Sequence, residues 1–379
     1  MAILKCYNII LDIKGLIKNY GFIIISSIVL LYFFTLFIFI FKSFANLKNI
    51  IKLLITALIL SRAGKKQEEN LIKIPTKRNR KQNKKRKKIK RDKKINHETS
   101  KSPGLIKSMS TKNTNYFVEL TLNFDNGTIN NLNKKVSKTN INFTDLIKRK
   151  DFELNGLDYE EAIIIDKRSY FQYYVSLIKN NHPILFSFVP FNDYNSFIIK
   201  IFLFFFSFSL DLTINALFFN DDTMHKIYED RGKFNFLYQI PQILYSTLIS
   251  KIIDTLIKNL ALSQDNIINI KREENVKDLN KTYLYKFVSC LKIKFISFFI
   301  VVFMILTFFL YYITCFCGVY INTQIHLMKD SGISLIISLL VPFGLFLIPG
   351  IFRISALRTE KPNRKYSYKF SAFLENLIG

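Results

Sequence analysis

The chain has 379 residues and a formal net charge of +27, yet 49% of its residues are hydrophobic and its mean hydropathy is +0.16. A chain that is both strongly basic and apolar must keep the two properties in separate segments, which is typical of a multi-pass membrane protein. Four cysteines are too few for a disulfide scaffold, and the composition is neither collagen-like nor that of a disordered chain. These classes are excluded, and long apolar runs are expected.

Five apolar runs are long enough to cross a bilayer, whose hydrocarbon core of about 30 Å requires about 20 helical residues. Three runs contain no charged residue: Gly21 to Phe41, Phe295 to Ile321 and Ser331 to Phe352. The other two, Ile201 to Phe219 and Phe236 to Ile257, contain isolated charges. We therefore predict an all-α integral membrane protein with about five transmembrane helices.

The charges of the connecting segments predict the orientation, because Lys and Arg close to the ends of spans favour the cytoplasmic side. Residues 42–197 hold 32 basic and 14 acidic side chains, whereas residues 220–237 hold three and four. A basic excess returns in residues 258–294 and in the tail from Arg353. With the N terminus outside and the C terminus cytoplasmic, every strongly basic segment lies in the cytoplasm.

Changes of composition divide the chain into three parts. We predict an N-terminal transmembrane anchor in residues 1–62, a polybasic low-complexity linker in residues 63–150 and a four-span membrane domain in residues 151–379. Within the linker, residues 77–94 hold 13 basic side chains and one acid, Asp92. Such a block repels itself and buries no apolar surface, so we predict that it is disordered.

The basic block has three interpretations. Lys and Arg clusters on the cytoplasmic side of a span attract anionic lipid headgroups, by about 1 kcal/mol per residue near the surface. The residues expected to make this contact are Lys84, Lys85, Arg86, Lys87, Lys88, Lys90 and Arg91. A solvated linker without a ligand is the second interpretation, and nuclear import or nucleic-acid binding is the third. The block lacks aromatic side chains on which bases could stack, so we expect the membrane, and no nucleic acid, as its partner.

Helical periodicity returns at Leu154, where Tyr159, Ile163 and Phe171 recur near a helical period. The pattern predicts an amphipathic juxtamembrane helix that lies on the membrane surface or packs on the membrane domain. We expect it to end at His182, because the following proline disfavours helical backbone at the residue before it.

Several motifs between Leu154 and Arg364 carry a family resemblance. They include Asp166-Lys167-Arg168-Ser169-Tyr170, Asp193-Tyr194-Asn195-Ser196, Asn215-Ala216-Leu217-Phe218-Phe219-Asn220, Tyr320-Ile321-Asn322-Thr323-Gln324 and Pro349-Gly350-Ile351-Phe352-Arg353. With these motifs the block resembles an uncharacterised membrane region of ciliates and related protists, which is often the C-terminal part of large surface proteins. The resemblance implies an ectodomain, one span, a basic cytoplasmic linker and then this block. It supplies no catalytic or ligand residues.

Motifs for catalysis or metal binding are weak. The glycines form no phosphate-binding loop ahead of a Lys-Ser or Lys-Thr pair. The four histidines lie in different segments, and Cys315-Phe316-Cys317 is inside an apolar run where a metal would lack further ligands. We expect no enzyme, no cofactor and no metal site, and a non-catalytic membrane anchor or scaffold as the function.

Asp211, Lys251 and Asp254 are the chemically unusual residues of the predicted second and third spans. A charge at the bilayer centre costs about 2.5 to 3.5 kcal/mol on an insertion scale. Lys251 and Asp254 are close enough on one helix to pair, and in an antiparallel hairpin Lys251 lies within about one turn of Asp211. One interpretation is a structural ion pair between two helices. The alternative is an ion or proton pathway in a channel or transporter subunit, which we would expect to assemble as a homo-oligomer.

The predicted orientation makes Asn126, Asn142 and Asn280 a test, because each matches the glycosylation pattern with Thr two residues later. All three should remain unmodified in a eukaryotic expression host, since they lie on the cytoplasmic side. Mass measurement before and after glycosidase treatment checks this expectation. A glycosidase-sensitive shift that disappears with Asn142→Gln would contradict the orientation.

Overall fold

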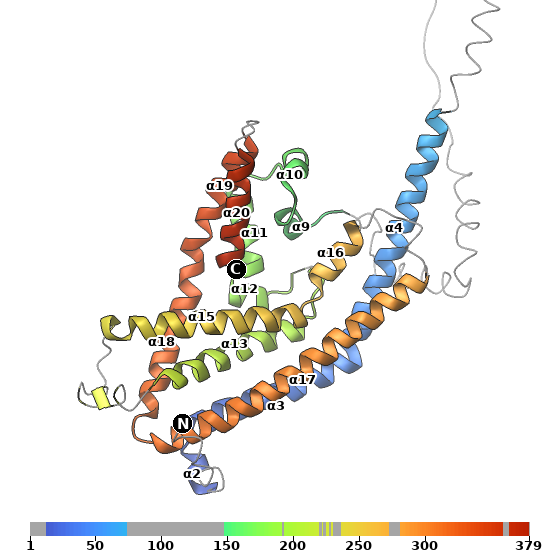
Figure 1. Ribbon diagram of the computed structural model, residues 1–379. Coiled ribbons are helices and arrows are strands. Elements are labelled where there is room, and N and C mark those ends of the chain that lie inside the picture. The colour runs from blue at the N-terminus through green and yellow to red at the C-terminus, as the bar shows by residue number, and fades with distance from the viewer. Residues whose placement is uncertain are drawn as a thin grey trace, which may run out of the picture. The chain divides into compact units, whose positions relative to one another are not determined.

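The computed structural model describes residues 13–73, 148–191, 193–219, 236–272, 281–358 and 364–378, together with residues 222, 225, 226 and 229. Within these ranges every regular element is a helix, which confirms the all-α prediction for this part of the chain (Figure 1). The basic block of residues 77–94 lies outside the described residues, as do Asn126, Asn142 and Asn280.

The chain forms two compact units. The larger, which we call the main unit, comprises Met1–Ile51, Arg149–Arg272 and Lys286–Gly379. The smaller comprises Lys52–Lys148 and Glu273–Tyr285. All contacts discussed below lie within the main unit.

Four helical stretches are long and apolar enough to cross a membrane: Tyr20–Ile59, Phe197–Phe218, Thr282–Val319 and Gln324–Arg358. The first combines α3 (Tyr20–Ile38), the π-helical turn η2 (Phe39–Ser43) and the beginning of α4 (Phe44–Lys73). The second is α13 (Phe197–Phe218), the third lies in α17 (Lys281–Val319), and the fourth joins α18 (Gln324–Leu345) to α19 (Leu347–Arg358). These helices agree with a multi-pass membrane protein.

The fifth predicted span corresponds to α15 (Phe236–Ala261), which is not among the four stretches. Its sequence is interrupted by Gln239, Gln242 and Lys251, whose polar side chains lower its hydropathy below that of the other spans. α15 nevertheless packs along α13, and α13 also contacts α18 (Figure 1). The described residues thus contain four helical stretches that are apolar enough to cross a membrane and one more polar helix at the fifth predicted position.

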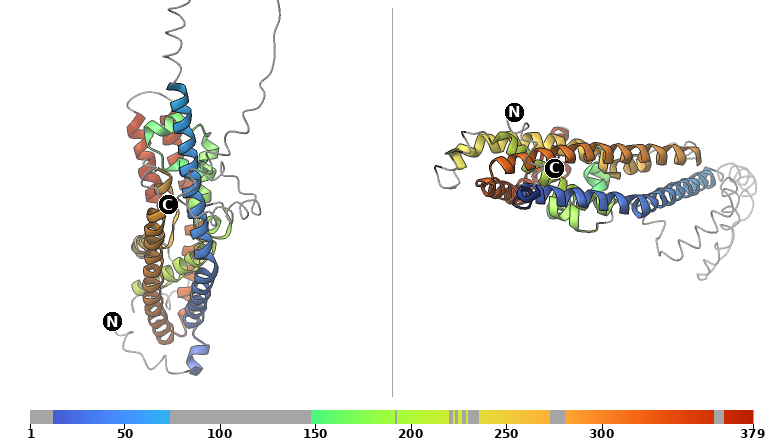
Figure 2. Two further views of the ribbon diagram at one scale, coloured as in Figure 1. Left: turned by 90° about the vertical axis from the view of Figure 1, so that its right-hand side faces the viewer. Right: turned by 90° about the horizontal axis from the view of Figure 1, so that it is seen from below.

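Helices α3 and α17 run antiparallel alongside each other (Figure 2). Residue numbers rise along α3 while those of its contacts on α17 fall. The Asn19 side chain donates to the Thr314 carbonyl at 2.8 Å, and the Tyr32 hydroxyl donates to the Phe299 carbonyl at 2.9 Å. Farther along, the Phe39 and Phe295 ring centroids are 4.7 Å apart. Gly21 permits this approach, because a Cβ atom there would collide with the side chains of Ile313 and Cys317.

Contacts between helix termini define two ends of the main unit. At the end that we call the distal end, the Tyr312 hydroxyl donates to the Ala216 carbonyl and the Gln324 side chain donates to the Lys18 carbonyl. At the other end, which we call the junction end, Lys294 donates to the Leu262 carbonyl at 2.8 Å. Successive long helices therefore alternate in direction between these two ends.

The predicted juxtamembrane helix is divided into three: α9 (Asp151–Asn155), α10 (Tyr159–Ile165) and α11 (Tyr170–Asn181). α10 ends at Asp166, whose backbone is extended, and Ser169 begins α11 through a capping box with Gln172. The predicted end at His182 is confirmed, and Pro183 occupies the first position of α12 (Pro183–Phe188). The hydrophobic periodicity continues across this break and therefore did not reveal it. The signal lay in Asp166 and Ser169, because Asp and Ser side chains favour helix termini.

Candidate functional site

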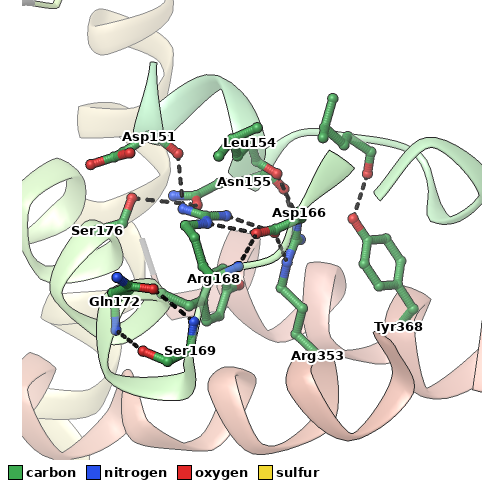
Figure 3. A network of polar contacts seen from close by, with 12 residues as sticks. Asp151, Leu154, Asn155, Asp166, Arg168, Ser169, Gln172, Ser176, Arg353 and Tyr368 are labelled. Carbon is green, nitrogen blue, oxygen red and sulfur yellow. Dashed lines mark hydrogen bonds and ion pairs between the residues drawn. The ribbon is translucent and has the colours of Figure 1, made fainter. Parts of the chain in front are cut away.

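Asp166 lies at the centre of a polar network that joins α9, α10 and α11 to α19 (Figure 3). Arg353 donates to Asp166 Oδ2 from Nε at 3.3 Å and from Nη2 at 3.1 Å. Arg168 donates from Nε to Oδ1 and from Nη2 to Oδ2, both at 2.8 Å. We call these three residues the arginine junction. Charge-assisted bonds of this kind are among the strongest hydrogen bonds in proteins.

Arg353 is completely buried, with 0% of its side chain and backbone surface exposed, and its remaining donors also have partners. Nη1 donates to the Asn155 carbonyl at 2.9 Å, and Nη2 donates to the Leu154 carbonyl at 2.6 Å. The guanidinium lies over the rings of Tyr173 and Tyr368, 4.9 and 4.7 Å from their centroids. A planar guanidinium can make all these contacts at once, whereas a lysine ammonium cannot.

The charges of the arginine junction do not cancel within it, because two guanidinium groups meet one carboxylate. Neighbouring polar groups compensate part of the excess: Arg168 donates to the Asp151 carbonyl and to Asn155 Oδ1, both at 2.9 Å. Burial alone would raise the pKa of Asp166, but the hydrogen bonds and charge of Arg168, with the charge of Arg353, outweigh it. The pKa of this carboxyl therefore lies below its usual value, and the group is ionised at neutral pH.

The C-terminal helix α20 (Arg364–Ile378) completes the junction from the other side. The Tyr368 hydroxyl donates to the Leu157 carbonyl at 2.6 Å, and burial raises the pKa of Tyr368 to about 12. The Tyr173 hydroxyl donates to Glu375 Oε2 at 2.9 Å. Both tyrosines are therefore neutral donors that hold α20 against α11 and the segment after α9.

A second buried ion pair joins α9 to α16 (Gln264–Arg272) at the same end. Lys271 Nζ lies 2.6 Å from Glu153 Oε1 and 2.8 Å from Oε2, and the Tyr194 hydroxyl donates to Oε1 at 3.1 Å. Burial, followed by the charge of Glu153, raises the pKa of Tyr194, so its hydroxyl stays protonated as a donor. We call Glu153, Tyr194 and Lys271 the lysine cluster.

A third buried charge, Lys200, lies in the first turn of α13 and pairs with Asp193 Oδ2 at 3.0 Å. Next to this pair, Asn195 Oδ1 accepts the backbone N–H groups of Ser263 and Gln264, both at 3.0 Å. These bonds satisfy donors at the start of α16 and hold it beside the start of α13.

The intramembrane charges predicted from the sequence lie on α13 and α15. Asp254 accepts a hydrogen bond from Ser207 on α13 at 2.6 Å and pairs with Lys258 at 2.8 Å. Asp254 and Lys258 are four residues apart and therefore share one face of α15. The charges of Asp254 and Lys258 act on both Asp211 and Lys251. The structure thus brings Asp254 to α13, and direct contact between Asp211 and Lys251 stays a prediction.

The predicted anionic-lipid contacts, Lys84 to Lys88 with Lys90 and Arg91, lie outside the described residues. Among the residues that the structure does describe, no three His, Cys, Asp or Glu side chains are grouped to hold a metal ion. The buried ion pairs Asp166–Arg353, Glu153–Lys271 and Asp193–Lys200 lie at the junction end.

No protein-family model, curated protein or solved structure matches this chain.

Only some residues of these networks belong to the motifs of the resemblance, and Glu153, Lys200 and Lys271 were not singled out from the sequence. Asp166 and Arg168 belong to the first motif, Asp193 to Asn195 to the second, and Arg353 to the last. A signal was available in Arg353, because an arginine directly after an uncharged apolar run needs a carboxylate partner if it is buried. Nothing in the sequence selects Asp166, 187 positions earlier, among the 28 acidic residues.

Removing Asp166 should destabilise the main unit by about 3 to 5 kcal/mol, because it leaves Arg353 buried without its carboxylate partner. Removing Arg353 should also destabilise it, but by less, because Asp166 keeps its two bonds to Arg168. The variants Asp166→Asn and Arg353→Met test these two losses, measured by thermal or denaturant unfolding of the full chain in detergent. The double variant should lose less than the sum of the two single losses.

Arg358→Met is the matched control, since Arg358 is an exposed arginine on the same helix. Its effect should stay within about 0.5 kcal/mol of the unmodified chain. Strictly additive losses in the double variant would show that Asp166 and Arg353 do not interact.

The lowered pKa of Asp166 also predicts a pH dependence. A carboxyl with a folded pKa below its unfolded value of about 3.9 contributes stability that is complete above that value and disappears as the pH falls through the folded pKa. The difference in unfolding temperature between the unmodified chain and Asp166→Asn should therefore be constant from pH 6 to about pH 4 and shrink below it. The exposed Asp158 provides the control Asp158→Asn, which should follow the unmodified chain.

Proposed function

We propose that this chain is a multi-pass membrane protein that acts as a non-catalytic anchor or scaffold and holds its basic segments at one membrane surface. The observation that carries this proposal is the arginine junction. It ties the last apolar span, through Arg353, to the segment that directly follows the basic linker, through Asp166 and Arg168. Because the donors of Arg353 are used by protein acceptors, the contact supports a rigid structural role.

We further propose five membrane crossings, with α15 returning beside α13. The start of α13 and the end of α15 both reach the junction end, where Asn195 binds Ser263 and Gln264. The end of α13 reaches the distal end, where the Ala216 carbonyl accepts from Tyr312. The proposed orientation has the N terminus outside and the junction end and the C-terminal tail in the cytoplasm, and the charge pattern supports it.

Contact between the basic linker and anionic lipid headgroups is part of the same proposal. The linker follows α4, whose beginning belongs to the first apolar stretch, Tyr20–Ile59. It ends before Lys150, which lies over the Tyr194 ring at 4.3 Å in the lysine cluster. Basic residues that lie on the cytoplasmic side close to a span attract anionic lipid headgroups, and this attraction is the contact that we propose for the linker.

The full chain reconstituted in phosphatidylcholine vesicles should capture a second population of vesicles that contains anionic phosphatidylglycerol. Capture should fall as salt rises, because the Debye length shrinks from about 10 Å at 0.1 M to about 3 Å at 1 M. Replacing the seven basic residues from Lys84 to Arg91 by glutamine should remove most of the capture, measured by co-sedimentation of labelled vesicles. Equal capture of a neutral second population would contradict the lipid contact.

The alternative function, a channel or transporter subunit, is favoured by one observation: α13 and α15 meet through the polar contact between Ser207 and Asp254, close to Asp211. The same vesicles separate the two functions. Ion or proton flux above that of protein-free vesicles, lost in Asp211→Asn, would contradict the scaffold proposal. Unchanged permeability in both forms supports it.

A further inference from the structure

An apolar groove of about 430 Å³ runs along the antiparallel helices α3 and α17. Its floor is made of buried aromatic side chains, among them Tyr32, Phe39 and Phe299. Its walls include exposed apolar side chains such as Ile300 and Met304. The volume lies within the range of small-molecule sites, about 300 to 1,000 Å³. The groove takes no part in the arginine junction or the lysine cluster.

The hydroxyl of the tyrosine in the groove floor already has a hydrogen-bond partner within the protein. The Tyr32 hydroxyl donates to the Phe299 carbonyl at 2.9 Å and is thereby satisfied inside the protein. An occupant of this part of the groove therefore gains only apolar contact and must itself be a flexible or flat hydrocarbon.

Positive charge is found at one mouth of the groove. Lys292 is exposed and lines the groove at the junction end of α17. Lys42 directly follows the apolar run of the first span, and the 4.7 Å contact between Phe39 and Phe295 puts it at about the same level as Lys292. An occupant with an apolar chain and an anionic head would match this distribution of groups.

The length of the groove matches one leaflet of a bilayer. From Lys292 at the mouth to Met304 at the deep end, α17 rises by about 18 Å at 1.5 Å per residue. Half of a hydrocarbon core of about 30 Å is about 15 Å. A lipid with its phosphate near Lys292 would therefore extend its acyl chain along the whole groove.

The π-helical turn η2, Phe39–Ser43, shapes this mouth. In a regular α-helix, residues five positions apart point in widely different directions, because each residue turns by about 100°. Here Phe39 and Phe44 both contact the Phe295 ring, at centroid distances of 4.7 and 6.3 Å. The wider π turn puts both side chains on the groove, and such turns are frequent at functional sites.

We propose that this groove binds one acyl chain of an anionic glycerophospholipid from the leaflet at the junction end, with Lys292, which lines the groove, contacting the phosphate. The site is separate from the basic linker and does not depend on the scaffold function. Through this site, the groove along α3 and α17 selects anionic over neutral phospholipids.

The chain contains no tryptophan, so a single introduced tryptophan reports on the groove without background. Phe303→Trp places the reporter on the groove wall at a side chain that is 43% exposed. Phe308→Trp is the matched control on the same helix, because Phe308 is 44% exposed and does not line the groove. The full chain is reconstituted in phosphatidylcholine vesicles with increasing amounts of phosphatidylglycerol or phosphatidylcholine that carry brominated acyl chains.

We expect brominated phosphatidylglycerol to quench Phe303→Trp at a mole fraction about fivefold lower than brominated phosphatidylcholine, the ratio expected for one lysine near an anionic headgroup. The two lipids should quench Phe308→Trp equally. Adding Lys292→Gln should remove the preference at position 303, whereas Lys329→Gln, which changes an exposed lysine outside the groove lining, should retain it.

Equal quenching of Phe303→Trp by both lipids would overturn the proposal. So would the absence of quenching by either lipid, which would mean that a second copy or another helix covers the groove. If Phe303→Trp fails to fold, native mass spectrometry of the chain without the reporter decides. One anionic phospholipid should be retained per chain and lost with Lys292→Gln, and equal retention in both forms would contradict the site.

Discussion

A guanidinium group withdrawn from water at the end of an apolar helix constrains the rest of the junction end. Arg353 is completely buried, and an unpaired buried ion would cost several kcal/mol. The chain meets this constraint by bringing the Asp166 carboxylate, two backbone carbonyls and two tyrosine rings around one side chain. Helices α9, α11, α19 and α20 are held together because each supplies or orders one of these partners.

The same solution recurs where other charges are buried at this end. Lys271 pairs with Glu153, and Lys200 pairs with Asp193, in both cases between separate helices or a helix and the segment before it. The hairpin of α13 and α15 differs, because Asp254 and Lys258 pair along a single helix. A pair that joins two segments fixes their relative positions, whereas a pair within one helix mainly neutralises charge. This contrast is why the junction end supports a structural role, whereas the hairpin of α13 and α15 supports only the alternative role of a channel or transporter subunit.

The main unit thus separates two kinds of surface. The junction end is held by polar groups that satisfy one another, while α3 and α17 present aromatic and aliphatic side chains that contact each other and leave a groove beside them. Lipid is the solvent that would cover such exposed apolar faces, since in water a patch of this extent marks an interaction site. Anchoring and lipid selection would then occupy different parts of the same molecule, one at the headgroup level and one within a leaflet.

The sequence alone determined the features that depend on neighbouring residues. Long apolar runs, three without a charge and one interrupted by Asp211, specified the four helices that are apolar enough to cross a membrane. Pro183 specified the end of α11, because proline restricts the residue directly before it. Only the tertiary structure decided the division of the juxtamembrane helix at Asp166 and Ser169, the partner of Arg353 and the groove between α3 and α17. Periodicity reports which face of a helix is buried but not against what, and the partners of Arg353 and Tyr32 lie 187 and 267 positions away along the chain.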